Sequence, residues 1–239
     1  MSVLKVRVKF AKEGSMKFIG HLDIMRYFQK AIRRAGIDIA FSEGFSPHMI
    51  MSFAAPLGVG ITSTGEYFDM EVNTATNSED MKKRLNAAMV EGMRILSIKK
   101  VDDGKASKAM SLVAAADYLV TFRPGQEKLR DMFLEHLADF YSQEQLLIWK
   151  KTKKSEKEID IRPFIYEMRR EGESIFLKLA AGSANNTKPE LVMEAFAGYL
   201  SVSVLEYAFE VHRLETYGEI QAEGRPVFVS LEGLGEEIE

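Results

Sequence analysis

Two histidines are the residues of this chain best placed for acid–base chemistry. His21 precedes Asp23 in the run GHLD, and His48 closes the run GFSPH. Histidine titrates near neutral pH, so it can exchange a proton or donate a hydrogen bond to a phosphate. One hypothesis is a shared site in which His21 and His48 act as acid and base, assisted by Asp23 or Asp160. The alternative is structural: Asp23 would stabilise a helix N-terminus, and a histidine beside it would have a packing role.

A predicted helix over residues 22–35 carries cations on the side opposite its apolar residues. These cations share one helix face or flank it: Arg26, Lys30, Arg33 and Arg34. Lysine and arginine neutralise the phosphates of RNA or DNA, so this face could clamp a nucleic-acid backbone. Phe45, as a stacking platform for a base, and Ser46, in the same turn, are further candidate binding residues. The alternative is an ordinary solvent-exposed helix face.

The second half of the chain adds one further candidate pair. Asp160 and Arg162 are two residues apart in the strand-like run EIDIR, so their side chains would share a face and could pair. A structural ion pair is one interpretation, and a site with Asp160 as an acid and Arg162 as a binding residue is the other. His21, Asp23 and His48 could in principle form a two-histidine, one-carboxylate metal site, but nothing in the sequence enforces that geometry. We therefore predict no metal and no cofactor.

The composition limits the classes of function that remain open. The chain has 239 residues and no cysteine, which excludes disulfides, cysteine nucleophiles and cysteine-ligated zinc or iron–sulfur clusters. The formal net charge is −3, so the molecule as a whole does not attract nucleic acid. The charge is uneven, however: residues 1–41 contain nine Lys or Arg against three acids, and residues 219–239 contain six Glu against one Arg. Because the sequence shows neither a membrane-spanning apolar run nor a signal-peptide core, we expect a cytoplasmic protein.

Apolar periodicity predicts an α+β fold of two tandem ferredoxin-like (βαββαβ) units with antiparallel sheets. The first half reads as strand 5–10, helix 22–35, strands 37–41, 50–54 and 65–72, helix 80–92 and strand 95–101. The second half reads as strand 116–122, helix 126–141, strands 146–151 and 158–161, a turn or short helix at 163–168, strand 174–180, helix 188–200 and strand 205–214. The predicted domains are residues 1–102, with the HLD and GFSPH motifs, and residues 116–217. A loosely attached acidic tail is expected at 218–239.

Four segments resemble the radical SAM-linked family, a bacterial domain family of unknown function: FIGHLDIMRYFQKAIRRAGI, FSEGFSPH, SFAAPLGVGITSTGEYFDMEV and IDIRPFIYEM. The resemblance spans roughly residues 3–215 and departs from the family pattern at Met49, where a second proline is expected after the histidine. It implies a protein fused to, or encoded beside, B12-type radical SAM proteins. Because the chain has no cysteine, it cannot hold the radical SAM cluster itself, so any such enzyme would be a separate partner.

Three functional hypotheses follow from these observations. In the first, which we favour, the protein is an accessory protein that binds RNA through the basic helix and a cleft between the two predicted units. In the second, it is an enzyme that acts on RNA or a nucleotide through His21 and His48. In the third, it is an adaptor that docks on a radical SAM protein and does not contact nucleic acid.

Overall fold

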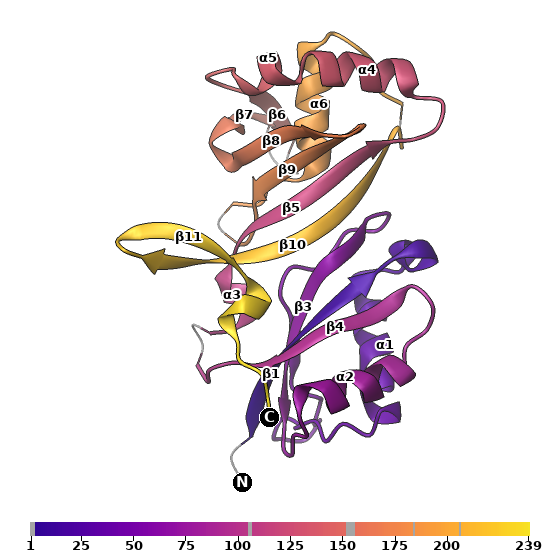
Figure 1. Ribbon diagram of the computed structural model, residues 1–239, viewed down its shortest axis with the longest axis vertical. Coiled ribbons are helices and arrows are strands. Elements are labelled where there is room, and N and C mark those ends of the chain that lie inside the picture. The colour runs from indigo at the N-terminus through magenta and orange to yellow at the C-terminus, as the bar shows by residue number, and fades with distance from the viewer. Residues whose placement is uncertain (1–2, 105–106, 152–155, 184, 206) are drawn as a thin grey trace. The chain divides into compact units, whose positions relative to one another are not determined.

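The computed structural model describes residues 3–104, 107–151, 156–183, 185–205 and 207–239 (Figure 1). The fold combines helices with a large, mostly antiparallel sheet, which agrees with the α+β class. The chain divides into two compact units, one of Met1–Ala115 with Arg213–Glu239 and one of Ala116–His212. Strands β5 (Val113–Phe122) and β10 (Phe209–Ala222) each begin in one unit and end in the other. None of the helices in the described ranges is long and apolar enough to cross a membrane.

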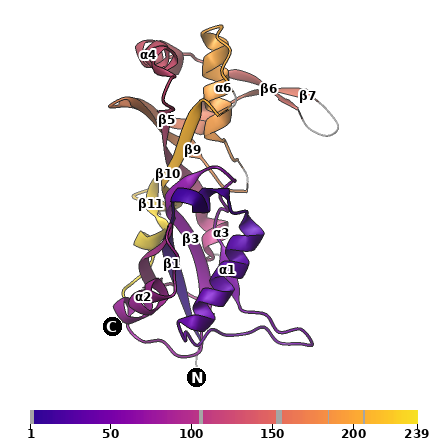
Figure 2. The same cartoon turned by 90° about the vertical axis from the view of Figure 1, so that its right-hand side faces the viewer.

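The first unit packs two helices against an antiparallel sheet. Its strands lie in the order β4-β1-β3, and β2 and the C-terminal part of β10 also pair with β3. Along the chain the main elements are β1 (Leu4–Lys12), α1 (His21–Arg34), β2 (Met51–Phe53), β3 (Thr62–Val72), α2 (Ser78–Ala87) and β4 (Met93–Lys100). Two short helical segments add to them: η1 (Gly14–Phe18) and α3 (Ala109–Leu112). Figure 2 shows α1 and α2 beside strands β1 and β3.

The buried face of α1 determines where the charges of this helix point. Ile24, Phe28 and Ile32 recur at helical spacing and are buried in the core of the first unit. The Phe28 ring centroid lies 4.8 Å from that of Phe10 on β1 and 4.8 Å from that of Phe68 on β3. Aromatic contacts of this kind add to the free energy gained from apolar burial. Since this face is fixed against the sheet, the charged positions of α1 face solvent.

The last residues of the chain belong to the first unit. Strand β11 (Arg225–Ser230) pairs with β10, and the helical turn η3 (Leu231–Leu234) follows it. Glu236 then forms an isolated antiparallel bridge to Lys100 at the end of β4. Residues 218–239, which the sequence suggested to be a loosely attached tail, therefore contribute backbone hydrogen bonds to this unit.

The second unit contains four strands of the large sheet and a separate hairpin. Its strands lie in the order β10-β5-β9-β8, and β6 pairs with β7 in a two-stranded sheet of their own. The rings of Phe140 and Phe196 stack in its core at a centroid distance of 4.2 Å. Besides β5 and β10, its elements are α4 (Glu127–Glu135), α5 (Leu137–Tyr141), β6 (Leu147–Lys151), β7 (Glu156–Asp160), η2 (Arg162–Phe164), β8 (Ile165–Glu171), β9 (Ser174–Ala180) and α6 (Pro189–Tyr199).

Several predicted elements have shifted bounds in the structure, and three differ in type or continuity. Residues 37–41 form two isolated bridges and not a strand, because their backbone hydrogen bonds are divided among α1, β3 and the segment before β2. The predicted helix 126–141 is interrupted at His136, where φ is −98° and ψ is 10°. Residues 163–168, predicted to be a turn or short helix, contain the end of η2 and the first part of β8, which runs to Glu171. Exposed charged side chains hide the alternation of this strand, as is common at the edge of a sheet.

Candidate functional site

The exposed side of α1 presents a row of cations. All four predicted binding residues on this helix are exposed: Arg26, Lys30, Arg33 and Arg34. Arg26 pairs with Asp23 over 3.2 Å, but both side chains are 67% exposed, and so exposed a pair leaves the arginine accessible. Arg34 donates a hydrogen bond of 3.0 Å to a backbone carbonyl just after α2. Lys30 and Arg33 have no partner among the residues that the structure describes.

Other cations of the basic N-terminal segment are neutralised inside the first unit. Arg7 is buried and pairs with Asp69, with Nε 2.8 Å from Oδ1. Lys9 Nζ lies 2.6 Å from Glu215 Oε2 and 2.5 Å from Glu232 Oε1. Burial acts to lower the pKa of Lys9, but the hydrogen bonds and charges of the two glutamates outweigh it and raise that pKa. The basic start and the acidic end of the sequence thus partly cancel each other, and the exposed cations of the N-terminal segment are those of α1.

The GFSPH turn forms a closed loop that presents an aromatic side chain. Ser42 and His48 close its base: Ser42 Oγ lies 2.8 Å from His48 Nδ1 and accepts the backbone N–H of His48 at 3.1 Å. Gly44 adopts a φ of 107°, a conformation that glycine reaches without steric cost. Phe45 is fully exposed, and Ser46 is exposed beside it. The loop therefore makes the face of a phenylalanine ring available for stacking.

The two histidines have separate surroundings. His21 is the first residue of α1, and its ring centroid lies 5.2 Å from that of Phe53 in an edge-to-face contact. Between His48 and Phe53 the chain forms the isolated bridge at Met49 and then strand β2, so at the usual strand rise these two residues lie roughly 16 Å apart. The structure therefore does not bring His21 and His48 together in one acid–base site. Within the described residues, no group of three His, Asp or Glu side chains is placed to hold a metal ion.

Asp160 and Arg162 make structural contacts with different partners. Asp160 Oδ1 accepts the backbone N–H groups of Leu146 and Arg162, both at 2.9 Å, and so joins the two ends of the β6–β7 hairpin. The Arg162 guanidinium stacks on Tyr141 at 4.3 Å and donates to the backbone carbonyl of Gln143 at 3.2 Å. The predicted side-chain pair is replaced by a side-chain-to-backbone contact, because β7 ends at Asp160 and strand alternation does not continue to Arg162.

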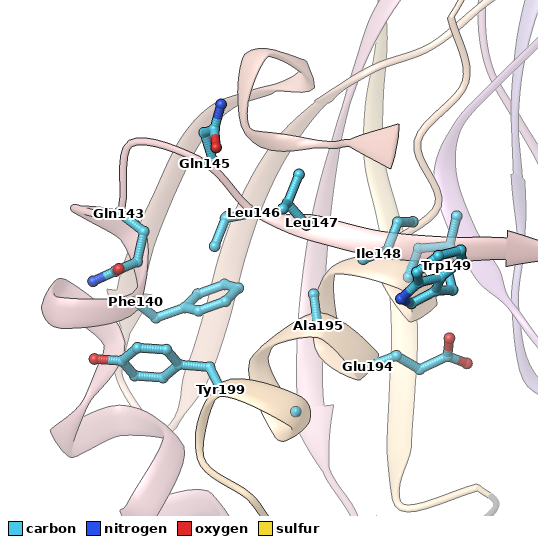
Figure 3. Close-up of a pocket in the computed structure, with 12 residues that line it drawn as sticks. Phe140, Gln143, Gln145, Leu146, Leu147, Ile148, Trp149, Glu194, Ala195 and Tyr199 are labelled. Carbon is cyan, nitrogen blue, oxygen red and sulfur yellow. The ribbon is translucent and has the colours of Figure 1, made fainter. Parts of the chain in front are cut away.

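The second unit holds a pocket that the sequence analysis did not identify (Figure 3). It has a volume of about 400 Å³ and lies between β6 and α6. Its lining is mainly apolar and includes Phe140, Leu146, Trp149, Glu194 and Tyr199. Trp149, the only tryptophan of the chain, is 71% exposed. The sequence analysis made no use of this residue, although a tryptophan directly before a lysine run is poorly placed to be core and is therefore a sequence signal for an exposed aromatic surface.

Comparison with known proteins identifies a family for this chain. A family model described as an uncharacterized protein conserved in bacteria (DUF2344) matches residues 5–189. The chain belongs to the DUF2344 family. The prediction of a bacterial domain family of unknown function is thereby confirmed. No curated protein matches the chain.

The DUF2344 match includes most of the candidate residues. It covers α1 and the loop 42–48 in the first unit, and Trp149 on β6 in the second. It ends at the first residue of α6, before Glu194. The cationic helix face and the exposed aromatic loop thus both lie within the segment that the DUF2344 family model matches.

Proposed function

We propose that this DUF2344 protein binds RNA through the exposed face of α1 and the loop 42–48, as an accessory protein to a radical SAM enzyme. The observation that carries the proposal is the row of accessible cations on α1: Arg26, Lys30, Arg33 and Arg34. From the first to the last of these residues the helix rises about 12 Å, which is long enough to contact more than one phosphate. The net charge of −3 does not oppose this binding, because a polyanion responds to the local field of the surface it meets.

The loop 42–48 supports RNA over duplex DNA as the ligand. Phe45 can contribute to binding by stacking only if a base is unstacked from its neighbours, as in single strands and loops of RNA. Stacking of one base on an aromatic side chain is worth about 1–3 kcal/mol. The bracing of the loop by Ser42 and His48 lowers the entropy lost when Phe45 makes such a contact.

The association with a radical SAM enzyme rests on the resemblance of the four sequence segments. Without cysteine, this chain cannot ligate an iron–sulfur cluster, so it would supply RNA binding and its partner would supply the chemistry. An adaptor that binds the enzyme without RNA is the competing hypothesis. An enzyme that uses His21 and His48 together is less compatible with their separate surroundings.

We also infer that both units are ferredoxin-like. In the first, the element order β1-α1-β2-β3-α2-β4 and the strand order β4-β1-β3, with β2 beside β3, support this assignment. In the second, the element order β5-α4/α5-β8-β9-α6-β10 and the strand order β10-β5-β9-β8 support it, and β6–β7 would be an insertion. This assignment concerns the fold and does not establish RNA binding.

Charge reversal on α1 tests the RNA-binding proposal. The variant Arg26→Glu, Lys30→Glu, Arg33→Glu would be compared with wild type for binding to bulk transfer RNA and to labelled oligouridine over a range of salt concentrations. If three phosphate contacts are lost, the slope of log K against log salt concentration should become shallower by about 2–3. A control with the same change in charge reverses three exposed lysines outside α1: Lys83, Lys108 and Lys128.

Several results would contradict the proposal. Wild-type affinity of the α1 variant would exclude α1 as the binding face. Equal losses in the α1 variant and the control would show that net charge, and not this helix, governs binding. Recovery of a radical SAM protein without RNA from native cells, after crosslinking with ultraviolet light, would favour the adaptor hypothesis. Loss of turnover on a captured RNA in a His21→Ala, His48→Ala double variant would instead favour the enzyme.

A further inference from the structure

The pocket between β6 and α6 combines an accessible aromatic surface with one charged side chain (Figure 3). Its volume of about 400 Å³ is within the range of sites for small ligands. Trp149 on β6 is 71% exposed, and the exposed Glu194 on α6 lies at the same end of the pocket. Neither side chain has a partner among the residues that the structure describes. A flat apolar surface and two carboxylate oxygens are therefore both free to meet a ligand.

The aromatic residues of the pocket favour a planar ligand. Phe140 and Tyr199 lie at the other end and pack against each other, with ring centroids 5.6 Å apart. The three rings thus do not surround one point, as they would in an aromatic cage for a cation. A planar ring that stacks on Trp149 and extends along the pocket matches this arrangement better.

Glu194 indicates which planar ring fits. Guanine presents two adjacent donors, N1–H and N2–H, on its Watson–Crick edge, and one carboxylate can accept both. Adenine and cytosine present an amino group beside an acceptor, and uracil presents one N–H between two carbonyls, so none of them offers this pair of donors. The carboxylate of Glu194 repels phosphate, which indicates that a base, and not a phosphate, occupies this end of the pocket.

We propose that the pocket binds a guanine base, which stacks on Trp149 and donates two hydrogen bonds to Glu194. This inference rests on the proposed RNA-binding function, because RNA would be the source of the guanine. In that function the cations on α1 contact the RNA backbone without regard to sequence, and the pocket adds a preference for one base.

Because Trp149 is the only tryptophan, its fluorescence reports directly on the proposed site. The full-length protein would be titrated with GMP, AMP, CMP and UMP, and with the single-stranded RNAs UUGUU and UUAUU. GMP and UUGUU should change the emission at concentrations about tenfold lower than the ligands without guanine, as expected for one bidentate pair. Tighter binding of UUGUU than of GMP supports RNA as the source of the base. Equal binding assigns the site to a free guanine nucleotide and overturns the link to RNA.

A pair of variants on one helix isolates the role of the carboxylate. Glu194→Gln keeps the size of the side chain but replaces one acceptor by a donor. Guanine ligands should then bind about tenfold more weakly, whereas adenine ligands, whose amino group and adjacent acceptor match one amide, should bind no more weakly than to wild type. Glu190→Gln makes the same change in charge at an exposed position of α6 that does not line the pocket, and should leave all affinities unchanged. Trp149→Ala, measured by the anisotropy of labelled UUGUU, should weaken binding by about tenfold or more, and Trp149→Phe by less.

The outcomes that overturn the inference are distinct from those that overturn the proposed function. No response of Trp149 to millimolar GMP or UUGUU refutes the guanine site, as does equal affinity for the four bases. A response to arginine or tetramethylammonium in place of guanine assigns the pocket to a cation. GMP is free of the long backbone that α1 would contact, so its titration should not change in the α1 variant. If GMP binds but charge reversal on α1 leaves transfer RNA binding intact, the pocket stands and the proposed function fails.

Discussion

Replacement of Asp69 by asparagine should destabilise the first unit by several kcal/mol. The side chains of Asp69 and Arg7 are 3% and 1% exposed, and Arg7 Nε and Nη2 donate to the two carboxylate oxygens at 2.8 and 3.2 Å. Asp69 Oδ2 also accepts the backbone N–H of Ala109 at 2.7 Å. Arg7 donates further to the carbonyls of Ser107 and Leu231 at 2.7 and 3.0 Å. The pair thus joins β1 and β3 to the start of α3 and to the C-terminal turn η3.

The size of the effect follows from the burial of this pair. Asparagine has the shape of aspartate without its charge, so Asp69→Asn leaves the Arg7 guanidinium buried without a counter-charge. Loss of one member of a buried pair typically costs about 3–5 kcal/mol, a large share of the roughly 5–15 kcal/mol by which a domain is stable. Lys5 Nζ, 3.9 Å from the same carboxylate, would lose its attraction as well. We also expect faster proteolysis after Leu231, since its carbonyl is held by Arg7.

An exposed pair in the same unit provides the matched control. Asp23 pairs with Arg26 at 3.2 Å, but both side chains are 67% exposed, so Asp23→Asn should cost at most about 1 kcal/mol. Urea unfolding followed by circular dichroism measures both variants. If Asp69→Asn loses no more than Asp23→Asn, the argument from burial is refuted. In the double variant Arg7→Met, Asp69→Asn neither member of the pair carries a charge, so part of the lost stability should return.

Three further predictions concern other contacts of the structure. Gly65→Ala should cost the first unit about 1–3 kcal/mol in urea unfolding, because an added Cβ would lie 2.8 Å from the backbone nitrogen of Glu215. Burial acts to raise the pKa of Glu232, but hydrogen bonds from Lys9 and a serine hydroxyl outweigh it and lower the pKa. The folding free energy that these contacts contribute is therefore present above the ordinary pKa of 4.5 and is lost as pH falls through the lower pKa of Glu232 in the folded state. In Glu232→Gln, stability should accordingly decline less steeply below pH 4.5 than in wild type. Asp160→Ala removes the acceptor of two backbone N–H groups, so it should lower the free energy of unfolding by about 1–3 kcal/mol and shift the fluorescence emission of the tryptophan on β6. A variant with wild-type stability and emission would contradict the structural role of Asp160.

The parts of the fold that sequence could predict are those governed by local periodicity. The helix predicted over residues 22–35 is α1 (His21–Arg34), because its apolar positions recur every three to four residues and Gly36, with a φ of 62°, ends it. The same periodicity predicted that its cations face solvent. Strand β8 was missed for the opposite reason. Its sequence contains few apolar residues and many charged ones, so it lacks a clear alternation of apolar and polar residues and resembles a turn.

The parts that sequence could not predict are contacts between distant segments. The charge asymmetry of the sequence was visible, but not that Lys9 and Glu232, 223 residues apart, would neutralise each other. Likewise, the positions of His21 and His48 at element boundaries suggested one site, but the extended chain between Phe53 and His48 separates them. Residue type and local pattern do not specify which ends of helices and strands lie close together in the fold.

Some basic residues of the N-terminal segment lie on the surface and others in the interior, and only the surface residues yield variants that can test RNA binding. Arg7 and Lys9 belong to the basic N-terminal segment, but their replacement would remove buried or partly buried ion pairs and lower stability. A loss of RNA binding in such variants would then report unfolding as much as a lost phosphate contact. Lys30 and Arg33 carry the same charge on an exposed face, so their reversal should change affinity and leave the urea midpoint nearly unchanged. If affinity and stability fall together in the Lys30→Glu, Arg33→Glu variant, lost structure explains the weaker binding. Unchanged affinity in a variant of wild-type stability would refute the assignment of α1 as a binding surface.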